Sequence, residues 1–463
     1  MSSLIHKACE KRTKKCILDA KQNEYNERII AMKQLIRVGM LGIGNIGRGT
    51  WQALAMNHDR ILESTGLDIE IVKILNRHPD KDRGIDIPKE KYTAEVGDIL
   101  DNPEIDIVVE LIGGIEPATE YMARALSNGK SVVTANKAAI AANGRYLVDL
   151  AQQNHVLIRC EAAVAGGIPI LTSLTTALLS NSFSEVHGIL NGTTNYILTQ
   201  MTEYGNDYAQ VLKEAQNKGF AEADPAADVE GYDAANKLSI LMSIIFGAEV
   251  SPEDIPTRGI TTIAREDIEY SLNAGYRIKL LASAKKGKKG LYANVEPVLI
   301  PAGHPLAAVS NEFNAVFVKG NAVDDLMFYG RGAGPLPTGS AVLGDIIGIA
   351  RKLEKDSAYD IVPQLRYDSG VKFIGEGASK YYVRMTVTDR PGVLGRITTT
   401  FGQFGVSVEA VRQEAPYESG KERVASLIFR IFEVERPLLY YVLNKILNEN
   451  IIKSIDNIMR IED

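Results

Sequence analysis

Cysteine is scarce in this sequence, and long apolar runs are missing. The three cysteines of the 463-residue chain, Cys9, Cys16 and Cys160, have the spacing of neither a metal site nor a disulfide framework. The longest apolar run, residues 238–248, is too short to cross a bilayer. These features argue against a membrane protein and against a disulfide-rich secreted protein, and they favour the reducing cytoplasm.

Concentrated positive charge is missing as well. The chain has 52 lysines and arginines against 58 acidic residues, and it contains no basic stretch of the kind that binds nucleic acid. Residues 1–35 carry many charges but lack the apolar core of a secretory signal, so we predict an N-terminal extension. A chain of this length needs more than one hydrophobic core, so we expect several domains.

The most informative feature is a glycine-rich motif, Gly42-Ile43-Gly44-Asn45-Ile46-Gly47. It follows a predicted strand at residues 36–41 and precedes a predicted helix at residues 48–55. In a dinucleotide-binding turn, the first glycine permits the sharp turn and the second lets backbone amides approach a pyrophosphate. The third allows close packing of helix and strand. An ordinary glycine-rich turn is the alternative, but the flanking strand and helix favour cofactor binding. We therefore assign these residues to the cofactor: Gly42, Gly44, Asn45, Ile46 and Gly47.

Strands and helices alternate after this motif, which predicts an α/β fold with a Rossmann-type parallel sheet. Further strands are predicted at residues 69–75, 105–112, 131–134 and 156–160. We assign residues 36–160 to this NAD(P)-binding domain and expect residues 324–356 to complete it.

The end of the second predicted strand indicates the preferred cofactor. An NAD-specific domain usually carries an acidic residue there, whereas this chain has Asn76 and Arg77, with Arg83 further on. A guanidinium pairs well with a 2′-phosphate, so Arg77 favours NADP. A solvated surface arginine is the alternative, and use of NAD is not excluded.

The rest of the chain divides into two further domains. Residues 161–323 show a mixed α+β pattern, and residues 357–380 lose periodicity like a linker. From residue 381 to 463 the predicted order of elements is βαββαβ, which is the ferredoxin-like arrangement.

Three short polar segments follow predicted strands. Lys137 lies at the carboxyl end of the strand at 131–134, where ligands bind in an open α/β sheet. Glu161 opens a run rich in alanine and glycine, in which one carboxylate and several carbonyls could bind a hard cation. A plain turn between domains is equally compatible with that run. In the third segment, residues 191–196, Thr193 or Thr194 can cap a helix.

Acidic residues gather before a long apolar segment. Glu222, Asp224 and Asp228 precede Asp233 and Lys237, which are four residues apart at the start of a predicted helix over residues 232–246 and therefore share a face. A weak surface ion pair is the alternative. So many ionisable groups beside a buried helix are costly unless they bind something, and a lysine flanked by carboxylates suits an amino-acid substrate.

These motifs, in this order and spacing, resemble homoserine dehydrogenase from about Ile36 to Leu353. The segments that carry the resemblance are residues 42–47, 109–114, 134–137, 161–169, 190–195, 222–238 and 332–338. From residue 381 the chain resembles an ACT domain, a module that senses amino acids.

The resemblance implies an NAD(P)H-dependent reduction of L-aspartate 4-semialdehyde to L-homoserine. It makes Lys237 the general acid/base and places Lys137 against the cofactor and the reacting oxygen. The further residues implied are Glu222, Asp233, Asp228 and Thr193 for the substrate, Gly332 and Gly334 for the cofactor, and Glu161, Val164, Gly166 and Ile168 for a sodium ion. An aspartate dehydrogenase and a non-catalytic amino-acid sensor are the competing interpretations.

The turn at residues 389–392 is the expected effector site of the ACT-like unit. Its backbone amides lie before a predicted helix and suit a ligand carboxylate, with Asp389, Pro391 and Gly392 as the named residues. We expect an amino-acid effector, most simply L-threonine, and a homodimer or homotetramer. The alternative is that this unit only holds an oligomer together.

Overall fold

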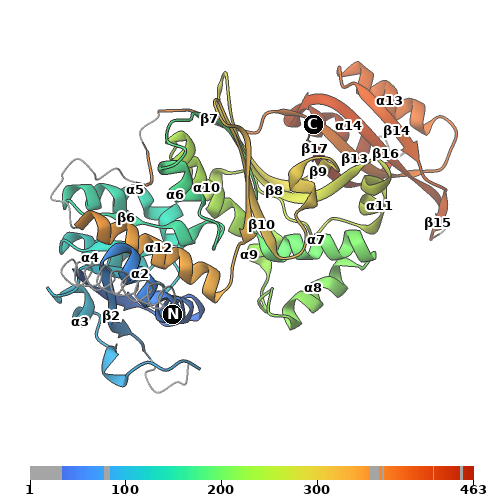
Figure 1. Ribbon diagram of the computed structural model, residues 1–463. Coiled ribbons are helices and arrows are strands. Elements are labelled where there is room, and N and C mark those ends of the chain that lie inside the picture. Colours follow the sequence, from blue (N-terminus) through green and yellow to red (C-terminus); the bar gives the residue numbers. More distant parts are fainter. Residues whose placement is uncertain are drawn as a thin grey trace, which may run out of the picture. The chain divides into compact units, whose positions relative to one another are not determined.

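The computed structural model describes residues 34–77, 84–353, 364–367, 370–420, 422–448 and 452–462 (Figure 1). Nearly all of the predicted N-terminal extension, and also Arg83, lie outside these residues. The chain divides into two compact units. The first contains the described residues up to Asn136, together with Leu147–Arg159 and the described residues from Thr338 to 353. The second contains Lys137–Tyr146, Cys160–Pro337 and the described residues from Gln364 onward.

The first unit is built on a parallel sheet of six strands in the order β3-β2-β1-β4-β5-β6. Its strands are β1 (Gln34–Leu41), β2 (Leu67–Leu75), β3 (Tyr92–Thr93), β4 (Ile107–Glu110), β5 (Ser131–Thr134) and β6 (Ile158–Arg159). Its helices are α2 (Asn45–Thr65), η1 (Lys89–Lys91), α3 (Gly97–Leu100), α4 (Ala118–Ser127), part of α5 (Lys137–Gln153) and most of α12 (Pro335–Leu353).

The strand order confirms the Rossmann-type prediction and locates the glycine motif. The order reverses between β1 and β4, and the motif directly follows β1, at the point where such sheets bind dinucleotides. Strand β3 was not predicted because its two residues are too short for a periodic pattern. Helix α2 is longer than predicted, because buried positions such as Ala53, Leu54 and Ile61 continue its apolar face until Gly66 ends it in the left-handed conformation.

The second unit contains a mixed sheet and a helix, α10 (Tyr232–Phe246), that is buried along most of its length. Its strands before residue 332 are β7 (Phe183–Ile189), β8 (Tyr276–Gly287), β9 (Gly290–Pro301), β10 (Phe313–Gly320) and β11 (Asp324–Arg331). Its helices in the same stretch are η2 (Glu161–Ala163), α6 (Ile170–Thr175), α7 (Gly192–Tyr204), α8 (Tyr208–Asn217), α9 (Ala226–Val229), α10 (Tyr232–Phe246), η3 (Pro252–Asp254), α11 (Arg265–Asn273) and η4 (Pro305–Ala308). Helix α10 has the predicted bounds, and nearly all its side chains are buried.

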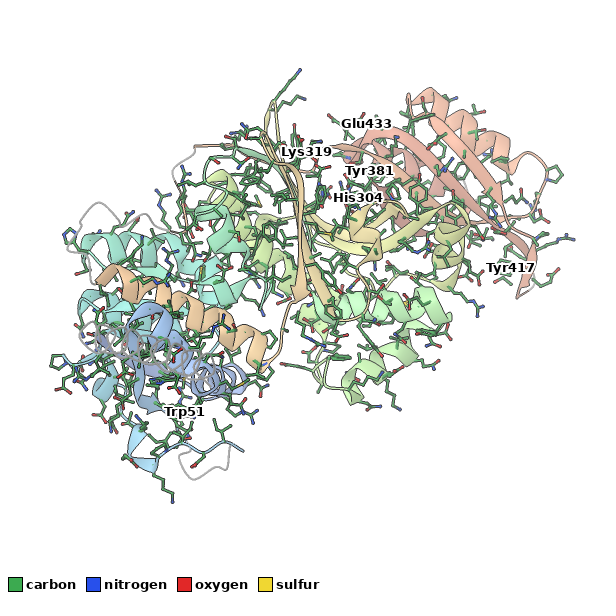
Figure 2. The ribbon with its side chains drawn as sticks, viewed as in Figure 1. Trp51, His304, Lys319, Tyr381, Tyr417 and Glu433 are labelled. Atoms are coloured by element: carbon green, nitrogen blue, oxygen red, sulfur yellow. The ribbon has the colours of Figure 1, made fainter. Side chains whose placement is uncertain are left out.

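The C-terminal part confirms the predicted βαββαβ order, with two small strands added, β12 and β15. Its elements are β12 (Phe373–Gly375), β13 (Ala378–Thr388), α13 (Val393–Gln403), β14 (Val408–Gln413), β15 (Tyr417–Ser419), β16 (Glu422–Glu435), α14 (Arg436–Leu447) and β17 (Ile452–Ile461). Apolar side chains of α13 and α14 form one buried core with those of the strands, among them Phe401, Leu443 and Phe429. In Figure 2, Tyr381 marks strand β13 and Tyr417 marks the hairpin that β15 forms with β16.

Two expected boundaries differ from the structure. Residues 324–356 were expected to complete the nucleotide domain, but β11 (Asp324–Arg331) pairs with β10 along its whole length, and the chain joins the first unit only from Thr338. Within the expected linker 357–380, β12 pairs with β9 and β13 has already begun. Short or edge strands of this kind gain their stability from a distant partner, which local patterns do not reveal.

The ferredoxin-like part is not a separate sheet. Strand β17 pairs in parallel with β9, with Arg460 opposite Val298 and Ile461 opposite Leu299. The result is one sheet of 11 strands, in the order β11-β10-β7-β8-β9-β17-β13-β16-β14, with β12 and β15 attached at its side.

Candidate active site

Helix α10 positions the central ion pair of the site. Asp233 lies in its first turn and Lys237 one turn later, on the same face. The helix begins after Gly231, whose φ of +88° is a conformation that other residues rarely adopt. Lys237 Nζ lies 2.7 Å from Asp233 Oδ2, and the two side chains are 11% and 6% exposed. The pair is therefore buried, and the surface ion pair that was the alternative is wrong.

A second lysine meets the same carboxylate. Lys137 Nζ, from the first residue of α5, lies 2.8 Å from Asp233 Oδ1, and its side chain is 41% exposed. Lys237 also donates a hydrogen bond of 2.6 Å to the carbonyl oxygen of Leu190. Asp233 thus holds two ammonium groups, one buried and one open to solvent. We call Lys137, Asp233 and Lys237 the lysine cluster.

Asn191 connects this cluster to its surroundings. Its Nδ2 donates to Asp233 Oδ2 at 2.9 Å and to Asp228 Oδ1 at 2.6 Å. Its Oδ1 accepts from the backbone N–H of Thr194 at 2.9 Å, which makes Asn191 the N-cap of α7. The alternative of a helix cap at Thr193 or Thr194 is therefore wrong, because the side-chain amide of Asn191 already accepts from the free N–H group.

The hydroxyl of Thr193 contacts Asp228 instead of capping the helix. Its hydroxyl lies 3.0 Å from Asp228 Oδ2 and 2.6 Å from the carbonyl oxygen of Phe220. Glu222 stands apart from these contacts: its side chain is exposed, and no described residue bonds to its carboxylate. Its charge still acts on Lys137, whose pKa it helps to raise.

Burial and neighbouring charges shift the pKa values of the two lysines in opposite directions. Burial lowers the pKa of Lys237, and the neighbouring charge of Lys137 lowers it further, more than Asp233 can offset. Burial also acts on Lys137, but the charges of Asp233, Asp228 and Glu222 prevail and raise its pKa. Burial would raise the pKa of Asp233, yet the two lysines together lower it. Burial and the charge of Asp233 raise the pKa of Asp228.

The glycine motif of the first unit has room for a ligand. Gly42 has a φ of +104°, which suits the sharp turn after β1. A Cβ added at Gly44 would meet no atom within 4 Å, whereas one at Gly47 would lie 2.6 Å from the carbonyl oxygen of Gly42. Gly44 and Asn45 are exposed, and Arg77 is exposed at the end of β2. The open backbone at Gly44 therefore fits a pyrophosphate, as the motif predicts.

The loop expected to bind a cation, which begins at Glu161, lies next to Gly332. The N–H of Gly167 donates to the carbonyl oxygen of Arg331 at 3.0 Å, and a Cβ at Gly166 would lie 2.4 Å from the carbonyl oxygen of Gly332.

The four residues expected to bind the cation are all buried: Glu161, Val164, Gly166 and Ile168. The two carboxylate oxygens of Glu161 accept hydrogen bonds from the N–H groups of Leu171 and Thr172. Gly334 lies in the exposed turn before α12.

The turn at residues 389–392 is exposed at Pro391 and Gly392, directly before α13. Asp389 does not point freely into solvent, because its Oδ2 lies 2.9 Å from Nε of Arg423.

Comparisons with known proteins cover most of the chain. Residues 42–161 match the model of the homoserine dehydrogenase NAD-binding domain, residues 169–347 match that of homoserine dehydrogenase, and residues 381–446 match the ACT domain. The homoserine dehydrogenase of Bacillus subtilis is 38% identical over 427 residues, which cover 92% of this chain and 98% of that protein. The chain belongs to the homoserine dehydrogenase family.

Solved structures of the family support this assignment. A homoserine dehydrogenase from Thiobacillus denitrificans shares 39% identity with a TM-score of 0.87, covering 93% of this chain and 99% of the other. A hyperthermophilic archaeal homoserine dehydrogenase in complex with NADPH shares 28% identity with a TM-score of 0.59, covering 69% of this chain and 98% of the other. This chain is thus an NAD(P)-dependent oxidoreductase with an NAD(P)-binding domain and a C-terminal ACT domain.

Two polar residues of the chain were not assigned a role from the sequence. Asn191 bridges two carboxylates, as described above. Glu110, fully buried at the end of β4, accepts hydrogen bonds from the N–H groups of Ile112 and Gly113 and from the hydroxyl of Thr134. Burying a carboxylate in an apolar strand is costly unless the carboxylate is hydrogen-bonded. The position of Glu110 within the predicted strand at residues 105–112 could therefore have indicated a hydrogen-bonding role for it.

The described part of the chain lacks two further features. It contains no group of three or more His, Cys, Asp or Glu side chains placed to hold a metal ion. None of its helices combines the length and apolar character that a bilayer crossing requires.

Proposed function

We propose that the lysine cluster is where L-aspartate 4-semialdehyde is reduced to L-homoserine. The supporting observation is that one buried carboxylate, Asp233, pairs with both Lys137 and Lys237. Two fixed ammonium groups beside each other can stabilise the negative charge that forms on a carbonyl oxygen during reduction.

Lys237 is the proton donor in this proposal. Burial and the charge of Lys137 lower its pKa, and a general acid is most effective when its pKa approaches the working pH. Two of the three N–H groups of its ammonium bond to Leu190 and Asp233, which leaves the third for the substrate oxygen. Asp233 orients the ammonium group, and solvent restores the proton after each turnover.

Lys137 has the complementary role. Its raised pKa keeps it charged at neutral pH, so it stabilises the developing alkoxide and contacts the cofactor side without giving up its proton.

Carboxylates near the cluster bind the substrate ammonium. Both oxygens of Asp233 already accept from the protein's own donors, so it orients the lysines more than it binds substrate. Glu222 has an exposed carboxylate that no described residue bonds, and it is suited to the ammonium group. Asp228 and Thr193 line the same side and support that contact.

NADPH is the proposed cofactor, and when bound it supplies the hydride. Gly42, Gly44 and Gly47 give the backbone the approach that its pyrophosphate needs. Arg77 provides a guanidinium for the 2′-phosphate at the end of β2. The archaeal relative was solved with NADPH, which is consistent with this choice, while NAD remains a second cofactor.

A sodium ion suits the loop that begins at Glu161. One carboxylate and the carbonyls of Val164, Gly166 and Ile168 form an all-oxygen donor set, which hard cations prefer. We assign this ion a structural role only.

The remaining proposals concern regulation and assembly. We assign L-threonine as an inhibitor bound at the turn formed by Asp389, Pro391 and Gly392, and a homodimer or homotetramer in the cytoplasm. Titration of the full chain with L-threonine should lower turnover, and Asp389→Ala should raise the concentration needed for half-inhibition. A chain that ignores threonine and all related amino acids would contradict the sensor role.

A single assay tests the reaction itself. NADPH oxidation is measured with aspartate semialdehyde, with oxaloacetate plus ammonia, and with neither. We expect oxidation only with the semialdehyde and L-homoserine as its product. Oxidation with oxaloacetate and ammonia would instead identify an aspartate dehydrogenase, and no oxidation at all would favour a sensor.

A further inference from the structure

A polar cavity of about 280 Å³ lies in the second unit and is lined by residues of α7, α11, β8 and η4. Figure 1 labels α7, α11 and β8. No residue of the lysine cluster lines it. Its charged lining consists of Arg277, Lys279 and Glu203, with the hydroxyl groups of Thr202 and Ser310 beside them. Pockets for drug-sized ligands usually enclose about 300–1,000 Å³, so this cavity suits a smaller metabolite.

Lys279 is a buried cation without an opposite charge in contact. It is 5% exposed, and its Nζ donates to Asn195 Oδ1 at 3.2 Å and to the carbonyl oxygen of Val309 at 2.6 Å. Both acceptors are neutral, and no carboxylate among the described residues forms an ion pair with it. Burial lowers the pKa of Lys279 to about 8. An ammonium group is costly to bury in this way, and its third N–H group has no acceptor among these contacts.

Arg277 adds a second cation to the same wall. Its Nη1 donates to the carbonyl oxygen of Tyr276 at 2.9 Å, and within the described chain its guanidinium forms no ion pair with a carboxylate. A guanidinium has five N–H donors in a planar fork that matches a carboxylate. Glu203 is exposed and accepts one long hydrogen bond of 3.4 Å, from the hydroxyl of Ser310.

We propose that this cavity binds a free α-amino acid, with its carboxylate between Arg277 and Lys279 and its ammonium group at Glu203. Two cations without a carboxylate partner among the described residues, and one available carboxylate, on the walls of a single small cavity, are complementary to a zwitterion. The site is separate from the lysine cluster and from the turn at residues 389–392, so it does not depend on the roles proposed for either.

The cavity is connected to the active site through Asn195. The side chain of Asn195 accepts from Lys279, and its Nδ2 donates to the carbonyl oxygens of Val309, Asn311 and Phe313. Its backbone N–H bonds to the carbonyl oxygen of Asn191, the residue that holds Asp228 and Asp233. A carboxylate that captures Lys279 would therefore order residues 305–313 and the first turn of α7.

Hydrogen exchange of the full chain, followed by mass spectrometry, tests this site directly. The probes are the common α-amino acids, one at a time, with sodium acetate and ethylammonium chloride at the same concentration. We expect at least one amino acid to slow exchange in residues 305–313 and 192–199, and acetate or ethylammonium to have a much smaller effect. Arg277→Gln should weaken that binding at least tenfold.

Two control variants distinguish binding in this cavity from a general effect of charge and from binding at the turn at residues 389–392. Lys286→Gln, at an exposed position of the same strand, and Asp389→Ala should both leave the protection unchanged. Arg277 is only half-buried, so its variant remains informative if Lys279→Met does not fold. The proposal is overturned if no amino acid slows exchange here, if acetate alone protects equally well, or if the protection persists in Arg277→Gln.

Discussion

At the scale of single residues, the proposed chemistry depends on two lysines that share one carboxylate. Asp233 holds Lys137 and Lys237 at 2.8 and 2.7 Å, and the different burial of the lysines drives their pKa values apart. Such a division is typical of a site in which one group transfers a proton and the other stays charged.

We predict that Lys237→Met lowers kcat by about 10²- to 10⁴-fold, the usual contribution of a general acid. Methionine fills the same volume without a proton to give, so NADPH binding should persist. Steady-state kinetics and a fluorescence titration of NADPH measure the two effects. Lys213→Met, at an exposed position of α8, is the control and should match the unaltered enzyme. Normal turnover in Lys237→Met would remove Lys237 from the mechanism.

The pH dependence of the reduction should identify the donor. Because the reaction needs protonated Lys237, kcat falls as pH rises through the lowered pKa of that lysine. In Lys137→Met the neighbouring positive charge is gone, so the pKa of Lys237 rises and the falling limb moves to higher pH, whatever the residual rate. A pH–rate profile of the two enzymes decides this. If the falling limb of the profile stays at the same pH in Lys137→Met, the group that titrates is not Lys237.

Arg77 decides the cofactor in our proposal. We predict that Arg77→Glu lowers kcat/KM for NADPH at least tenfold, because a carboxylate repels the 2′-phosphate and a charged hydrogen bond is lost. The value for NADH should stay equal or rise. Arg366→Glu, at an exposed position of the second unit, is the control for a simple change of net charge. An unchanged ratio for the two cofactors would exclude Arg77 from the cofactor site.

At the scale of elements, one residue at the start of α7 both caps the helix and bonds two carboxylates of the proposed site. Asn191 caps the helix with its oxygen and bridges Asp228 and Asp233 with its nitrogen. One residue therefore sets both the beginning of the helix and the orientation of the carboxylate that holds the lysines.

The two roles can be separated by substitution. Asn191→Ser retains a capping hydroxyl but cannot bridge both carboxylates, so we predict that kcat/KM falls about 10- to 100-fold while the Tm changes little. Asn191→Ala removes both functions and should also lower the free energy of unfolding by about 1 kcal/mol. Kinetics and thermal unfolding of the pair test this. Equal stability of the two variants would mean that the cap contributes nothing.

At the scale of the whole molecule, buried ion clusters fasten the C-terminal part to the mixed sheet. Glu296 of β9, 1% exposed, pairs with Arg258, with Arg436 of α14 and with Arg460 of β17. Asp267 of α11, fully buried, accepts hydrogen bonds from Tyr382, Arg384 and Asn457. A chain cut before Ser379 would lose all of these partners except Arg258.

We predict that this truncated chain loses about 10 °C or more in Tm or precipitates, because breaking a buried ion pair costs about 3–5 kcal/mol. Glu296→Gln combined with Asp267→Asn should recover part of that loss in the truncated chain and destabilise the full chain. Thermal unfolding of the full and the truncated chain, each with and without the double substitution, tests whether the substitution raises the Tm of one and lowers the Tm of the other. If the truncated chain keeps the Tm of the full chain, the clusters do not carry the stability assigned to them.

The sequence alone was sufficient wherever the information is local. The glycine motif after β1, the alternation of strands and helices, and the bounds of α10 all depend on residues a few positions apart. The shared face of Asp233 and Lys237 follows from helical geometry in the same way. These features were predicted and then observed.

Only the tertiary structure decided which distant groups meet. It brought Lys137 and Asn191 to Asp233 and made the ion pair a buried one. It also paired β11 with β10, joined β17 to β9, and left Lys279 and Arg277 facing a cavity without carboxylate partners among the described residues. Such contacts depend on burial and on the packing of elements far apart in the chain, which no local pattern of side chains records.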